Sequence, residues 1–113
     1  EASALLSLYG VEMPTRHAVE QCRIIVHACE QLAIACHNLK GMRGVQEALV
    51  QVKLHEDEGD RVLREALAAL FRDEAIDPLI VIRWKDIYEG LERALDACET
   101  AANVIANIVV KNA

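Results

Sequence analysis

Three long stretches of the chain place apolar residues at alternating intervals of three and four, within residues 14–40, 45–72 and 78–110. A mean interval of 3.5 residues is typical of α-helices that pack side by side at a shallow angle. At 1.5 Å per residue, helices of this length are roughly 40–50 Å long. Because the connections between the stretches are short, neighbouring helices must run in opposite directions. The pattern therefore predicts an all-α fold, an elongated antiparallel three-helix bundle.

The same pattern predicts which side chains face the bundle core. For the first stretch these are Ala18, Cys22, Ile25, Cys29, Leu32, Cys36 and Leu39. For the second stretch they are Val45, Leu49, Val52, Glu56, Gly59, Leu63, Ala66 and Leu70. For the third they are Ile80, Trp84, Ile87, Leu91, Ala94, Cys98, Ala101, Ile105 and Ile108. The second stretch thus has a carboxylate and a glycine at its two middle core positions.

The segment before Pro14 has the features of a separate helical piece. Residues 2–9, ASALLSLY, are apolar and helical in type, and Gly10 is a residue that often follows a helix end. Pro14 suits the first turn of a new helix, where its missing N–H is tolerated. We therefore expect residues 1–12 to form a short extra N-terminal helical piece, the tail of a preceding helix. Residues 13–113 would form the three-helix unit.

Composition narrows the classes of function. Apolar residues make up 53% of the 113, enough for a buried core, and the aromatic content of 4% is low for a β-sandwich. The net charge of −6 argues against nucleic-acid binding, which needs a basic face. No apolar run approaches the ~18–20 residues of a membrane span, and the N-terminus lacks a charged-then-apolar leader. We expect a cytoplasmic protein without direct membrane insertion.

The four cysteines are expected to be structural. Cys22, Cys29 and Cys36 are seven residues apart, so consecutive thiols lie roughly 10 Å apart along one helix. That distance excludes a disulfide between them and shared ligation of one metal ion. Their core positions predict small buried thiols in a reducing cytoplasm. Cys98 can approach one of them across the bundle. His55, beside acidic residues, is a candidate for orienting metal ligands.

Acidic residues crowd the stretch LHEDEGD in the middle of the second helix. Glu56 and Asp60 are four apart, so their side chains project from one face, and Glu56 holds a core position. A carboxylate there must be paired, protonated or bound to a cation, because burying an isolated charge is costly. Asp57 and Glu58 project elsewhere, within reach of Arg61, and we expect them to be solvated.

The last helix offers a matching pair of carboxylates. Glu92 and Asp96 are four apart, and their helical neighbours are apolar or acidic, so nothing on their own helix neutralises them. The two pairs are therefore candidate metal ligands. On spacing alone two alternatives stay open. The acids face solvent, or Glu56 pairs with Arg23, Arg83 or a residue outside this chain.

Two stretches resemble a known family. HEDEGDRVLREALAALF and IDPLIVIRWKDIYEGLERALDACETAANVIANIVVKNA are similar to the divergent branch of the PhoU-like phosphate transport regulators. The resemblance runs over the whole chain, is strongest from Leu54 to Ala113, and is most specific in DIYEGLERALDACE. That family has two tandem three-helix repeats in a protein about twice this length. This chain resembles the second repeat with the end of the first.

The resemblance implies a metal-binding regulator. The family's ExxxD elements match Glu56 to Asp60 and Glu92 to Asp96. Glu56, Asp60, Glu92 and Asp96 are thus the implied ligands of iron, zinc, magnesium or manganese, with no organic cofactor. Thr100 departs from the family, because relatives commonly have an acid there, and this removes one ligand. The implied partners are a phosphate transporter or sensor protein, together with the missing first repeat or a second copy of the chain in a homodimer.

Several classes of function follow from these observations. The one we favour is a non-enzymatic regulator of phosphate transport that acts by partner contact, with bound metal setting its surface charge or packing. The alternative is a metal-storage or metal-dependent carboxylate helical-bundle protein. That class usually carries Glu-x-x-His ligand pairs, and no such pair occurs in the sequence. A third reading, a purely structural helical module, needs no metal.

Overall fold

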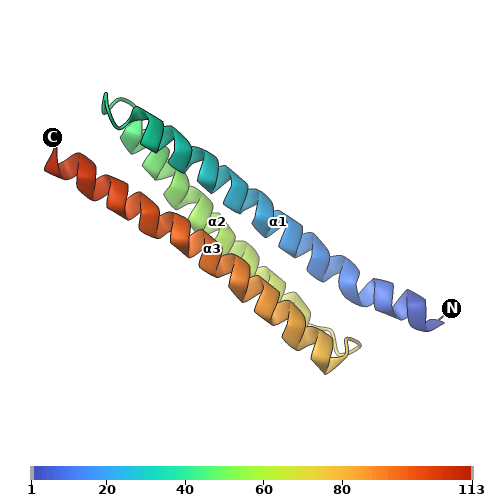
Figure 1. Ribbon diagram of the computed structural model, residues 1–113. Helices are drawn as coiled ribbons and strands as arrows, with labels where there is room; N and C mark the ends of the chain where they lie inside the picture. Colours follow the sequence, from blue (N-terminus) through green and yellow to red (C-terminus); the bar gives the residue numbers. More distant parts are fainter. Residues whose placement is uncertain (1, 113) are drawn as a thin grey trace.

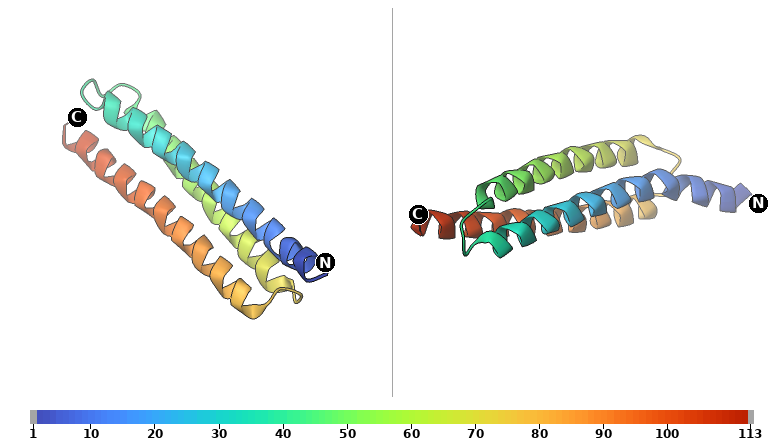
Figure 2. Two further views of the ribbon diagram at one scale, coloured as in Figure 1. Left: turned by 45° about the vertical axis from the view of Figure 1, so that its right-hand side comes forward. Right: turned by 90° about the horizontal axis from the view of Figure 1, so that it is seen from above.

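The protein is a rod of three α-helices (Figure 1). The computed structural model describes the backbone of residues 2–112 and the side chains of residues 14–112. α1 spans Ala2–Asn38, α2 spans Val45–Arg72 and α3 spans Pro78–Lys111. The rod measures 62 × 19 × 16 Å. α2 runs back along α1, and α3 contacts both, which confirms the predicted antiparallel three-helix bundle (Figure 1, Figure 2).

The two connections have local causes in the sequence. α2 begins after Gly44, whose φ of 75° lies in the left-handed region that glycine adopts at little cost. α3 begins at a side-chain cap, where the Asp77 carboxylate accepts a hydrogen bond from the backbone N–H of Leu79 at 2.8 Å. Pro78 occupies the first turn, where its missing N–H costs no helical hydrogen bond. These short connections reverse the chain twice, so α1 and α3 run in the same direction.

α1 is one continuous helix, so the prediction of a separate N-terminal helical piece is wrong as secondary structure. Pro14 lies inside α1 instead of at its start. A proline removes one backbone donor and can bend a helix without ending it. The N-terminal end of α1 extends beyond the α2–α3 connection (Figure 2). The division into residues 1–12 and 13–113 as parts of different repeats stays a prediction.

The turn of α1 that contains Pro14 is held to α3. The Tyr88 hydroxyl donates a hydrogen bond to the Pro14 carbonyl at 3.0 Å. Tyr88 is fully buried, and this burial raises its pKa to about 12. The phenol therefore stays protonated and able to donate at physiological pH.

The buried positions of α2 lie close to the predicted ones. They are Val45, Ala48, Val52, Glu56, Gly59, Val62, Ala66 and Leu70. Ala48 and Val62 are buried where Leu49 and Leu63 were predicted, and both leucines pack against the edge of the core. In α3 the buried residues are Tyr88, Leu95, Cys98, Ala102 and Ile105. Ile87 and Ile108, predicted for the core, are 45% and 40% exposed.

α1 is turned by about one residue from its predicted orientation. Its buried side chains include Gln21, Ile24, Ala28 and Ala35. Cys22, Cys29 and Cys36 are exposed, so the prediction of buried thiols is wrong for these three. Cys98 is buried as predicted, and this burial raises the pKa of its thiol to about 11. The small side chains of Ala28 and Ala35, both fully buried, let α1 approach its neighbours closely.

Gly59 lies where α2 packs tightly against both of its neighbours. A Cβ at this position would overlap Leu95 Cδ2 of α3 and would lie 3.7 Å from Ile24 Cγ2 of α1. The absence of a side chain at this core position therefore lets α2 approach α1 and α3 closely. Gly90 is different, because a Cβ there would meet the Arg93 side chain at 3.6 Å, an ordinary contact.

Among the described residues, no helix combines the length and the apolar character that a membrane crossing requires.

Candidate metal centre

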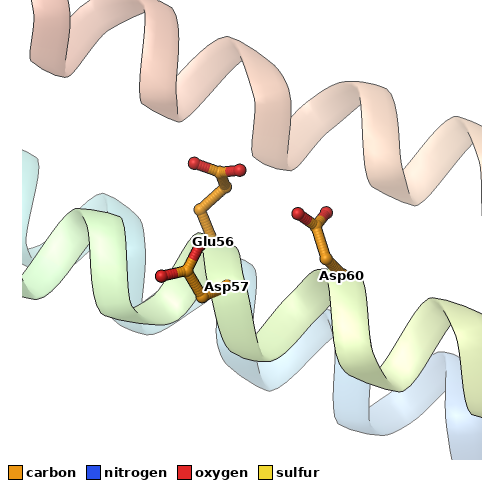
Figure 3. Close-up of side chains that lie close together, drawn as sticks. All are labelled: Glu56, Asp57 and Asp60. Atoms are coloured by element: carbon orange, nitrogen blue, oxygen red, sulfur yellow. The ribbon is translucent and has the colours of Figure 1, made fainter.

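Carboxylates gather where α2 faces α3. Figure 3 shows the carboxylates of Glu56 and Asp60 extending from α2 toward α3, while that of Asp57 points to one side. One oxygen from each of these three residues lies within 4.8 Å of the others. Glu92 of α3 lies beside Asp60 and Asp96, whose negative charges act on it. The fold thus places Glu92 of the second ExxxD pair beside Asp60 of the first, whereas the group of three carboxylates with mutually close oxygens includes neither Glu92 nor Asp96.

Lys53 is the cation that compensates the buried Glu56. Its Nζ lies 3.2 Å from Glu56 Oε2, 3.5 Å from Asp57 Oδ1 and 3.5 Å from Glu99 Oε2. The negative charge of Asp57 is the largest cause of a raised pKa of Lys53; burial opposes it, and the charge of Glu99 adds to it. Glu56 is only 7% exposed, whereas the Lys53 side chain is 61% exposed. The partner of Glu56 is therefore this lysine one turn earlier on α2, where the sequence argument had considered arginines on the other helices.

Glu92 has no such compensation among the described residues. Its Oε2 atom is buried and accepts no hydrogen bond there. Burial, and then the neighbouring Asp60 and Asp96 carboxylates, together raise the pKa of Glu92 to about 8. A buried carboxylate oxygen without a partner is costly, because it has lost its water without gaining a donor. The proton or a cation can remove that cost.

The donor set suits a hard or borderline cation. Carboxylate oxygens from two facing helices are ligands that magnesium, manganese, iron and zinc accept. The unpartnered Glu92 oxygen provides the observation that such an ion would explain. The Lys53 and Glu99 side of the interface opens onto a groove of about 400 Å³, which Asn103 and Gln46 also line. An ion could reach this side of the interface from solvent.

Three residues named in the sequence argument lie outside this cluster. The His55 ring stacks on His27 of α1, with ring centroids 5.7 Å apart, and so faces α1. Arg61 pairs with Glu65 at 2.7 Å instead of with Asp57 or Glu58. The Thr100 hydroxyl donates to the backbone carbonyl of Asp96 at 3.1 Å and so is committed to its own helix.

The role of Lys53 was not predicted from the sequence, although the sequence carries a signal for it. Lys53 precedes Glu56 by three residues and Asp57 by four, and residues at these intervals are neighbours on a helix surface. The contact of Lys53 with Glu99 could not be read in this way, because it depends on the rotation of α2 relative to α3.

Fold and site together define an all-α bundle with a carboxylate-rich interface between two of its helices. The chain is similar to the UPF0111 protein YkaA of Bacillus subtilis (strain 168). The two are 28% identical over 113 residues, which cover 98% of this chain and 55% of that protein. It is also similar to a protein of Rhizobium meliloti (strain 1021) named "Putative pit accessory protein". That match is 29% identical over 104 residues, 91% of this chain and 47% of the relative.

The chain spans about half the length of these curated relatives. No protein-family model matches it, and no solved structure does. The two relatives agree loosely with the PhoU-like resemblance, since one of them carries a name connected with phosphate transport.

Proposed function

We propose that the chain is a non-enzymatic accessory unit of phosphate transport that contacts a partner and binds a divalent metal ion between α2 and α3. The observation that carries the metal part is the buried Glu92 oxygen without a partner, which lies beside the Asp60 and Asp96 carboxylates. The transport part is supported by the name of the Rhizobium meliloti relative, "Putative pit accessory protein".

The electrostatics of the interface favour a further cation. The carboxylates of Glu56, Asp57, Asp60, Glu92, Asp96 and Glu99 lie along this side of α2 and α3. Lys53 contacts Glu56, Asp57 and Glu99, and the remaining three carboxylates act on one another. A divalent ion held by Asp60, Glu92 and their neighbours would relieve this repulsion. It would also change the charge that α2 and α3 present to a partner.

Metal-dependent melting tests this proposal. Purified protein is assayed for bound metal, treated with chelator, and melted with and without zinc, manganese, iron(II) or magnesium. A ligand at about 100 times its Kd adds about 2.7 kcal/mol to the free energy of unfolding. That corresponds to roughly 10 °C in a domain of this size. We expect at least one of these ions to raise the Tm and the double variant Glu56→Ala, Asp60→Ala to abolish this increase.

Two matched variants sharpen the test. Glu58→Ala removes an exposed acid from the same turns of α2 and should leave the metal response intact. Lys53→Gln removes the competing ammonium and should enlarge the response. If no metal co-purifies, and if the double variant and the parent melt identically with every ion, the metal part of the proposal is wrong.

The partner part has its own test. A phosphate transporter should retain the protein in a pull-down, and charge reversal on α2 should weaken the retention.

Oxygen-consumption and hydrolase assays with added iron or manganese would show turnover if the protein were a metal-dependent enzyme, and we expect none.

We also propose that an apolar face of the bundle is covered by a second helical unit, either the other half of a longer protein or a second copy. On α1, Val19, Val26 and Ile34 are 44%, 54% and 45% exposed. Ala18 and Cys22 help to line an apolar groove of about 350 Å³ on the same helix. An apolar surface of this kind is typical of an interaction site.

Light scattering of the 113-residue chain tests this association. We expect a dimer or larger species, and we expect Val26→Glu to shift it toward monomer, because a carboxylate in an apolar interface loses its hydration. Lys111→Glu, at the exposed end of α3, is the control and should leave the mass unchanged. A parent chain that stays monomeric at high concentration would contradict the proposal.

A further inference from the structure

Two thiols from different helices are in contact. Cys29 Sγ of α1 lies 3.7 Å from Cys98 Sγ of α3. The other two cysteines, Cys22 and Cys36, each lie seven residues from Cys29, roughly 10 Å along α1. Among the described residues, Cys29 and Cys98 are therefore the pair placed to react with each other.

The two thiols have different surroundings. Cys29 is exposed to solvent, whereas Cys98 is 6% exposed and belongs to the core cluster with Ile24, Ala28 and Leu95. An oxidant in solution therefore reaches Cys29 more readily than Cys98, and Cys98 lies beside Cys29. An accessible cysteine next to a second one is the arrangement found in reversible thiol oxidation.

We propose that Cys29 and Cys98 form a redox-responsive pair that a hydroperoxide converts into a disulfide between α1 and α3. This proposal does not depend on metal binding or on the role in phosphate transport. A disulfide needs the two sulfurs about 2.05 Å apart. From 3.7 Å this requires side-chain rotation and a small adjustment of the helices.

The reaction balances with hydrogen peroxide as the oxidant. The Cys29 sulfur attacks one peroxide oxygen, the O–O bond breaks, and the leaving hydroxide takes the Cys29 thiol proton to form water. Cys29 is now a sulfenic acid. The Cys98 sulfur attacks the Cys29 sulfur, the S–O bond breaks, and the hydroxyl leaves as a second water with the Cys98 thiol proton. Two thiols have lost two electrons and two protons, and one peroxide has become two waters.

The position of the pair gives the crosslink a structural effect. It would tie together α1 and α3, whose connection runs through the whole of α2, so it would close a long loop. Closing a long loop restricts the unfolded chain more than closing a short one. Glu99, which contacts Lys53, directly follows Cys98, so the tie also holds α3 beside the carboxylate cluster.

Peptide mapping of the oxidised chain tests the proposal. The double variant Cys22→Ser, Cys36→Ser keeps only the proposed pair. It is reduced, treated with a small excess of hydrogen peroxide, and digested without reductant. We expect the intact mass to fall by two hydrogen atoms, the Cys29 and Cys98 peptides to be linked, and the Tm to rise until dithiothreitol reverses it. With Cys98→Ala added in the same background, Cys29 should instead be oxidised to oxygen adducts that form no disulfide.

A second arm prevents association from hiding the thiols. The experiment is repeated with Val26→Glu added, which keeps the α1 face open to solvent. Persistence of both thiols in this variant would overturn the proposal. Disulfides between chains, or oxygen addition to Cys29 without a link to Cys98, would overturn it as well.

Discussion

Replacing Glu92 by glutamine is expected to stabilise the metal-free protein at pH 8. At that pH the parent must keep a half-buried carboxylate beside Asp60 and Asp96, with its Oε2 atom lacking a donor among the described residues. Glutamine removes the negative charge and supplies an N–H₂ donor that either aspartate can accept. After allowance for solvent screening, the gain should be on the order of 1–2 kcal/mol, or roughly 5–10 °C in Tm.

The pH dependence gives the sign of the effect. The ordinary pKa of Glu92 is 4.5, and in the folded protein it is raised to about 8. Between these values the folded state keeps a proton that the unfolded state has released. Stability from this group is therefore fully present below pH 4.5 and is lost as the pH rises to about 8. Glu92→Gln has no such proton to lose. The free energies of unfolding of the variant and the parent should therefore differ little at pH 5 and diverge toward pH 8.

Thermal or urea unfolding at several pH values, in the presence of chelator, measures this divergence. Glu58→Gln on the exposed side of α2 serves as the control and should follow the parent throughout. Parallel curves for Glu92→Gln and the parent would show that Glu92 does not keep its proton in the folded state. With a divalent ion added, the parent should become the more stable of the two proteins, because the variant has lost one of the proposed ligands.

The second large effect is expected from two glycines on different helices. Gly59→Ala should lower stability, because the new methyl group overlaps Leu95 Cδ2 in a part of the core where Leu95 is only 2% exposed. Overpacking of this kind typically costs about 1–3 kcal/mol. Gly90→Ala should raise stability by up to about 1 kcal/mol, since alanine is the better helix former and its Cβ makes only an ordinary contact.

Urea unfolding of the two variants checks the prediction, because both changes are glycine to alanine inside a helix. We expect the urea midpoint of Gly59→Ala to lie below that of the parent and the midpoint of Gly90→Ala to lie above it. If both variants are more stable, Leu95 can move aside without cost, and Gly59 is then not required for the approach of α2 to α3.

The number and direction of the helices could be predicted because the interval of 3.5 residues persists through three long stretches. The orientation of α1 could not. In that helix Cys22, Cys29 and Cys36 form one small apolar row, and Ala28 and Ala35 lie on the neighbouring row. Periodicity alone favours neither row. The buried row, that of Ala28 and Ala35, also contains Gln21 and therefore appears more polar in the sequence than the cysteine row.

Of the candidate site, the four ExxxD carboxylates were identified from helical spacing, and the structure places Asp60 of one pair beside Glu92 of the other. Their role as metal ligands stays a prediction. Two features depended on tertiary structure and were missed. One is the Lys53 bridge to Glu99, which joins residues far apart in the sequence. The other is the unpartnered Glu92 oxygen, which is buried only in the folded bundle.

Lys53 also bears on which ions the interface can admit. Its ammonium already offers Glu56, Asp57 and Glu99 one positive charge within 3.5 Å. A sodium or potassium ion that displaced it would bring the same charge and no electrostatic gain. A divalent ion brings twice the charge and returns a strongly hydrated ammonium to water. In the proposed metal site, this tethered ammonium would thus favour divalent ions over the more abundant monovalent ones.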